Sequence, residues 1–285
     1  GLMRAQLGAT TTALADLDMA IRLSPKLAHA YAQRGAIRSG RKELKLAHMD
    51  FQKAVSLRPK DPTVWFMLGD HYARHGDTTN ALQSFNRGLE FDPESVRLLR
   101  RRGGLYQALK DIPKALADFT RALAIDPSNA EIRGLRARLY AESGHLPEAI
   151  KDYSTALRSD PTNFLTWLSR ATVYHHSGDV AAAKRDLEQG EKVAGQKAEF
   201  WQERALIEAG WGDHPASLKS VGRALAMGGG KNPRLFLLRA ELREAAGKLE
   251  GAISDFERFL ELKPDDQLAD QLRTRVGVLR GRLGK

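Results

Sequence analysis

Residues 65–93 read WFMLGDHYARHGDTTNALQSFNRGLEFDP, and the spacing of small and apolar residues along this stretch decides the fold. Four of them recur at i, i+3, i+4 and i+7, which places them on one face of an α-helix: Trp65, Leu68, Gly69 and Tyr72. A second helical face follows at Ala81, Phe85 and Gly88. Gly76 separates the two faces and Pro93 closes the stretch, so the sequence predicts two short helices that form a hairpin.

The same pattern recurs along the chain with a period of 34 residues. Prolines stand at positions 25, 59, 93, 127 and 161, and the second helix of each unit carries a large apolar residue at its centre: Leu17, Phe51, Phe85, Phe119 and Tyr153. Gly195 takes the place of the next proline, and Pro264 lies one residue out of register. We expect the extra residue in the turn 228–230. Helices this short are marginal alone, so each hairpin must stack on its neighbour.

The repeated residues resemble those of the tetratricopeptide repeat family, over nearly the whole chain. The resemblance implies an all-α fold, a right-handed superhelical α-solenoid of helix hairpins with a C-terminal capping helix. The expected divisions are a truncated first repeat at 1–27 (the end of a first helix, Leu2–Leu7, and a second helix), seven units and a cap at 265–285. The seven units, which together span 28–264, are 28–61, 62–95, 96–129, 130–163, 164–197, 198–232 and 233–264.

Composition excludes several kinds of chemistry. The 285 residues include no cysteine, so disulfides, thiol catalysis and the usual structural zinc ligands are excluded. No apolar run has the length of a membrane span, and no signal peptide is visible. Because the first unit begins within a helix, we expect residues upstream, where a targeting signal would lie. We slightly favour the cytoplasm, and we predict no cofactor.

An arginine precedes the small residue of the first helix in most units, and an aspartate follows sixteen residues later in five of them. The pairs are Arg34–Asp50, Arg102–Asp118, Arg136–Asp152, Arg170–Asp186 and Arg239–Asp255. Only Arg204, which faces Ser220, breaks the match. We therefore predict an ion pair within each hairpin. The alternative is a ladder of arginines that binds a ligand. Because paired arginines are not available to a ligand, the net charge of +10 is weak evidence for an acidic partner.

The resemblance also implies that the first helices line a concave groove that holds a partner. Carrying the ligand-facing positions of the family over to this chain gives the candidate partner-binding residues: Phe66, Asp70, Arg74, Arg97, Arg100, Arg101, Gln107, Arg138, Leu165, Leu168, Thr172, His175 and Gln202. The set predicts a basic patch over 62–163 and a more apolar surface after it. Arg97 and Arg101 match two positions of the carboxylate clamp of chaperone-binding members. Ala32, Ala36 and Met67 replace the other three, so that clamp is absent.

Catalysis finds little support in the sequence. His71 and His75 lie one helical turn apart, but no carboxylate motif accompanies them, and we interpret them as surface histidines with no metal. The predicted function is a non-catalytic scaffold or adaptor that binds a peptide or helical segment of another protein, with an acidic segment as one candidate. The alternatives are a regulatory or substrate-recruiting arm of a larger enzyme and a nucleic-acid-binding solenoid. The last is disfavoured because the aromatic residues fill core positions.

Overall fold

The computed structural model describes residues 2–284, which fold into sixteen α-helices and one 3-10 turn and contain no strand. The chain divides into two compact units, Gly1–Leu139 and Tyr140–Lys285. The boundary falls within α8 (Ala130–Glu142).

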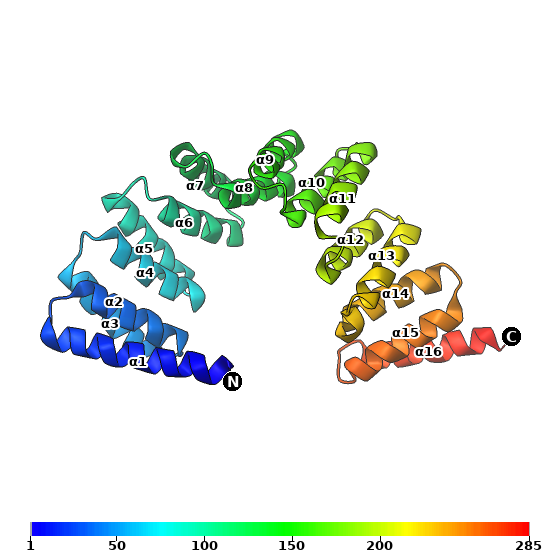
Figure 1. The fold of residues 1–285 in the computed structure, drawn as a ribbon, viewed down its shortest axis with the longest axis horizontal. Coiled ribbons are helices and arrows are strands. Elements are labelled where there is room, and N and C mark those ends of the chain that lie inside the picture. The colour runs from blue at the N-terminus through cyan, green and yellow to red at the C-terminus, as the bar shows by residue number, and fades with distance from the viewer. Residues whose placement is uncertain (1, 285) are drawn as a thin grey trace. The chain divides into compact units, whose positions relative to one another are not determined.

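Unit 1 is a stack of helical hairpins (Figure 1). Its other elements are α1 (Leu2–Leu23), α2 (Ala28–Gly40), α3 (Leu44–Leu57), α4 (Pro62–Arg74), α5 (Thr78–Phe91), α6 (Val96–Ala108) and α7 (Ile112–Ile125). Each first helix packs antiparallel to its second helix, as α2 does with α3, α4 with α5 and α6 with α7. The first helices α2, α4 and α6 also contact one another in series and so form one face of the unit.

Unit 2 repeats this arrangement (Figure 1). Its elements are α9 (Leu146–Ser159), α10 (Phe164–His176), α11 (Val180–Ala194), α12 (Ala198–Gly210), α13 (His214–Ala226), η1 (Gly229–Lys231), α14 (Pro233–Ala245), α15 (Leu249–Leu262) and α16 (Ala269–Leu283). The final helix α16 packs on α15 through Leu272, Val276 and Leu279, as expected of a cap. Leu268, which we expected on the same buried face, is exposed because it precedes the helix as its N-cap residue.

Close approach of the two backbones holds each hairpin together. A glycine of the first helix faces a buried phenylalanine of the second helix in three hairpins: Gly35 with Phe51, Gly69 with Phe85, and Gly103 with Phe119. A Cβ at Gly69 would lie only 2.6 Å from Cδ1 of Phe85. The ring therefore fills the space that a side chain would need, which explains the small and aromatic positions of the repeat.

The turns also follow the repeat. Gly76 ends its helix with φ of 81°, in the left-handed region that glycine accepts without strain. Lys110, one period later, takes the same conformation with φ of 60°.

The turns between hairpins are held by tryptophan side chains. Those of Trp65, Trp167 and Trp201 donate from Nε1 to a backbone carbonyl six residues earlier. For Trp201 that carbonyl belongs to Gly195, so this turn keeps its hydrogen bond without the proline.

Two local features depart from the regular 34-residue repeat, and only the first was not expected. α1 is one continuous helix from Leu2 to Leu23, where we expected the end of one helix and then a second. Gly8 stands in the register of Gly76. An aspartate that caps the next helix follows Gly76, but no aspartate follows Gly8. The extra residue near 228–230 lies where we predicted it, because the connection after α13 is longer and contains the 3-10 turn η1.

The arginine that recurs in the first helix of most hairpins links that helix to the second helix of the same hairpin. Four arginines donate from Nε and Nη2 to both carboxylate oxygens of the aspartate sixteen residues later, at 2.6–3.0 Å. These are Arg34–Asp50, Arg102–Asp118, Arg170–Asp186 and Arg239–Asp255, so the predicted pairing is confirmed in them. The aspartates are buried. The pair Arg136–Asp152 stays a prediction.

The third nitrogen of this arginine fork reaches the preceding hairpin, a contact that we did not predict. Nη1 of Arg102 donates to Oδ1 of Asn86 at 2.7 Å, and Nη1 of Arg170 donates to Oγ of Ser154 at 2.8 Å. The hydrogen bonds to Asp118, opposed by burial, raise the pKa of Arg102, so its charge is permanent. The forks of Arg102 and Arg170 thus join their own hairpins and tie each to the one before, and Nη1 of Arg34 likewise donates to Asp18 of α1.

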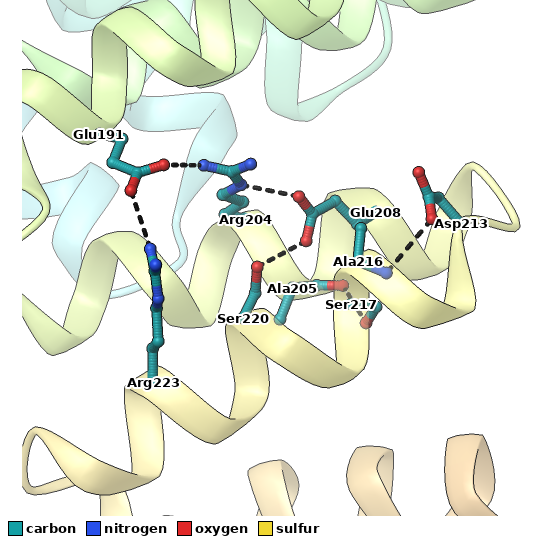
Figure 2. A network of polar contacts seen from close by, with 9 residues as sticks. All are labelled: Glu191, Arg204, Ala205, Glu208, Asp213, Ala216, Ser217, Ser220 and Arg223. Atoms are coloured by element: carbon teal, nitrogen blue, oxygen red, sulfur yellow. Dashed lines mark hydrogen bonds and ion pairs between the residues drawn. The ribbon is translucent and has the colours of Figure 1, made fainter.

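The exception at Arg204 keeps the same chemistry with other partners (Figure 2). Nε of Arg204 donates to Oε1 of Glu208 at 2.7 Å, and Ser220 donates to the other oxygen of Glu208 at 2.6 Å. Glu191 lies between Arg204 and Arg223 and accepts from both. Glu208 is buried and supplies the carboxylate that Ser220 lacks.

Substituting Gly69 by alanine tests the close approach in the hairpin. We expect Gly69→Ala to lower the free energy of unfolding by about 1–3 kcal/mol, because the new Cβ overlaps the ring of Phe85. Gly104→Ala is the matched control, since a Cβ there meets nothing within 4 Å, and it should raise stability by up to about 1 kcal/mol through helix propensity. Urea denaturation measures both, and equal effects of the two substitutions would contradict the packing described.

Candidate partner-binding site

A cavity of about 290 Å³ opens between the first helices α2 and α4 of unit 1. Ala36 and Gly40 have little or no side chain, which leaves this space unfilled. The lining residues are Ala36, Ser39, Gly40, Lys42, Phe51, Met67, Asp70, His71, Arg74 and His75. Asp70 and Arg74 were predicted from the sequence as partner-binding residues, and the structure brings both to this α2–α4 cavity. The cavity is therefore our candidate site.

Two histidines in the cavity share one serine. Nδ1 of His71 lies 2.8 Å from Oγ of Ser39, and Nε2 of His75 lies 2.9 Å from the same oxygen. The interpretation of His71 as a surface histidine is wrong, because its side chain is 6% exposed and contacts the ring of Phe51. The spacing of the two histidines was visible in the sequence. Ser39 was not predicted, because it comes from the neighbouring hairpin.

Asp70 organises the basic residues beside the cavity. Its Oδ2 accepts from Nε of Arg74 at 2.6 Å, and its Oδ1 accepts from Nη2 of Arg101 at 2.7 Å. Arg100 pairs with Glu131 at 2.7 Å. Three arginines of the predicted basic patch thus have acidic partners, so the patch is less charged than the sequence indicated.

Arg97 differs from these three arginines. Its guanidinium lies over the ring of Phe66, 3.7 Å from the ring centroid, and it forms no ion pair with a described residue. Burial lowers the pKa of Arg97, while the charge of Asp70 raises it and that of Arg101 lowers it again. A guanidinium held over an aromatic ring keeps N–H groups available for a carboxylate. Gln107, half-buried at the end of α6, and Arg138, exposed on α8, do not line the cavity.

The candidate residues of unit 2 form no comparable site. Leu168 is a correction: it is 3% exposed and packs in the core with Ala171 and Phe200, so it is not available to a partner. The other four candidates do not share one surface feature. Leu165 is 53% exposed, and Thr172 donates to the carbonyl of Leu168. His175 stacks on Trp211 with ring centroids 4.4 Å apart, and Gln202 accepts from Asn232.

Comparison with known sequences identifies the repeats. Models described as tetratricopeptide repeats match residues 26–96, 106–151 and 203–267, and a model described as a TPR repeat matches residues 137–178. The chain belongs to the tetratricopeptide repeat family. No curated protein matches it.

Solved structures of several other proteins have the same fold. One from Parabacteroides merdae is 19% identical, with 87% of this chain and 98% of that protein covered and a TM-score of 0.66. PilW, a type IV pilus biogenesis factor, is 21% identical, with coverage of 74% and 97% and a TM-score of 0.61. YrrB, described as having an unusual peptide-binding site, is 20% identical, with coverage of 66% and 97% and a TM-score of 0.55. At these identities the likeness shows the fold alone.

Residues 2–284 contain no group of three or more histidine, aspartate or glutamate side chains arranged to hold a metal ion. In the same range, none of the helices combines the length and the apolar character that crossing a membrane requires.

The surroundings of His71 predict how the stability of unit 1 depends on pH. Burial, followed by the charges of His75 and His48, lowers the pKa of His71 below its ordinary value of 6.5. Between that lowered pKa and 6.5, the unfolded chain binds more protons than the folded chain, so the free energy of unfolding falls as the pH falls through this window. Denaturation of wild type and His71→Gln over this range measures the effect. The variant should show a shallower decline, whereas the exposed His176→Gln should follow the wild type; identical curves for all three would contradict it.

Proposed function

We propose that unit 1 is a non-catalytic interaction module that holds an acidic segment of another protein on the face formed by α2, α4 and α6. Tetratricopeptide repeat proteins generally mediate protein–protein interactions and are typically scaffolds without catalytic activity. The observation that carries the proposal is Arg97, which lies over Phe66, forms no ion pair with a described residue, and feels the charge of the cavity residue Asp70.

The charge of this face supports an acidic partner. Lys42, Arg74 and Arg101 lie at or next to the cavity, and Asp70 offsets only part of their charge. Because Asp70 fixes two of the arginines in place, they lose little conformational freedom when a partner binds. A carboxylate on the segment can then accept two parallel hydrogen bonds from one guanidinium.

Two other functions follow from the same fold. A regulatory or substrate-recruiting arm of a larger enzyme would use this same face, so it differs in context rather than in the site. A nucleic-acid-binding solenoid needs aromatic rings that are free to stack on bases. In unit 1 the rings of Phe51, Phe85 and Phe119 are buried, which favours a protein partner.

Charge reversal at Arg97 tests the proposed site. We expect Arg97→Glu to weaken binding of a short oligoaspartate peptide by at least about tenfold at neutral pH, because the new carboxylate repels the ligand and leaves Phe66 uncovered. Fluorescence anisotropy with a labelled peptide measures the affinity. Arg121→Glu is the matched control, because Arg121 is an exposed arginine on the second helix α7 of the same unit.

Arg121→Glu should bind the peptide nearly as well as wild type, and both variants should keep the helical circular dichroism of wild type. An equal loss in the two variants would mean that net charge alone governs binding and would contradict the site. Tight binding of mixed-sequence nucleic acid at physiological salt would favour the nucleic-acid alternative.

A further inference from the structure

The serine between two imidazoles in the α2–α4 cavity has a property that the proposed function does not use. A hydroxyl group carries one hydrogen and two lone pairs, and a neutral imidazole carries one N–H. In the tautomer in which Nε2 of the exposed His75 carries no hydrogen, Ser39 donates to that nitrogen and accepts from Nδ1 of His71. In this neutral arrangement the hydroxyl hydrogen of Ser39 is occupied by a ring nitrogen.

Protonation changes this arrangement. When the accepting imidazole takes up a proton, its nitrogen becomes a donor, and the oxygen of Ser39 then accepts from both rings. The hydroxyl hydrogen of Ser39 becomes free to donate to another group. A single proton thus adds one positive charge and one hydrogen-bond donor to the cavity, and both additions favour an anion.

The charged groups around the two histidines do not supply a free carboxylate that would neutralise an imidazolium. Those facing them are Lys42 from the turn after α2, His48 from α3, Asp70, Tyr72 and Arg74 from α4, and Arg101 from α6 through Asp70. His48 is bonded to the hydroxyl of Tyr72 at 3.2 Å. Asp70 is the carboxylate among these groups, and two arginines bind it. It is therefore not free to neutralise an imidazolium, and an incoming anion can take that role.

We propose that the α2–α4 cavity is a proton-controlled anion site, which takes one carboxylate of the bound segment and gains a proton as it does so. This inference rests on the proposed function, because the carboxylate belongs to the acidic segment. A cavity of about 290 Å³ has room for a carboxylate side chain together with water. Linkage then requires the affinity to rise as the pH falls.

The test compares the affinity of the full chain for a short oligoaspartate peptide at about pH 7 and about pH 5.5, a range in which aspartate stays ionised and histidine titrates. We expect the dissociation constant to fall by about tenfold, which corresponds to uptake of roughly one proton. Isothermal titration calorimetry in two buffers of different ionisation enthalpy counts that proton directly. His75→Gln should reduce the change to less than about twofold.

His75 is exposed at the end of α4, so its substitution is expected to leave the fold intact. The matched control is His176→Gln, an exposed histidine at the same end of α10, which should keep the full pH dependence. A pH dependence that persists in His75→Gln overturns the inference. So does equal affinity at both pH values with normal sensitivity to Arg97→Glu, although the proposed function then stands. Failure to bind at either pH overturns both.

Discussion

The arginine fork is the interaction on which the rest of the structure depends. Each helix of the repeat is too short to be stable alone, and apolar packing by itself sets no unique register between neighbouring hairpins. Arg102 supplies that register because its planar group bonds Asp118 of its own hairpin and Asn86 of the preceding one. A lysine could not make these contacts together, since it lacks the fork geometry.

The same forks determine which charges remain for function. An arginine that binds a buried aspartate in two places is not available to a ligand, so Arg34, Arg102, Arg170 and Arg239 are structural. What remains in unit 1 is a short face with a different arrangement, in which Asp70 lies between two arginines and Arg97 covers Phe66. The net charge of +10 therefore says less about the partner than these few residues do.

The sequence was sufficient for the hairpins, the glycine turns and the pairing of Arg34, Arg102, Arg170 and Arg239, because each depends on residues within one period. It failed where contacts cross between hairpins. Ser39 and His71 are 32 residues apart, and their bond follows only from the stacking of α2 on α4. The pairing of Arg204 with Glu208 was missed for a related reason. Glu208 stands in the register of a tyrosine, and nothing in the spacing shows that the Glu208 side chain turns inward. Leu168 was misassigned because the repeat position facing a ligand in the family faces the core here.

A double-mutant cycle on Arg102 and Asp118 tests the central claim most directly. The variants Arg102→Met, Asp118→Leu and the double substitution are compared with wild type, with hydrogen exchange of α6 and α7 amides as the measure of local stability. We predict that each single substitution destabilises these helices by about 3–5 kcal/mol and that the double substitution costs less than the sum of the two, with a coupling energy of about 2–3 kcal/mol. Additive effects, with a coupling energy near zero, would contradict it.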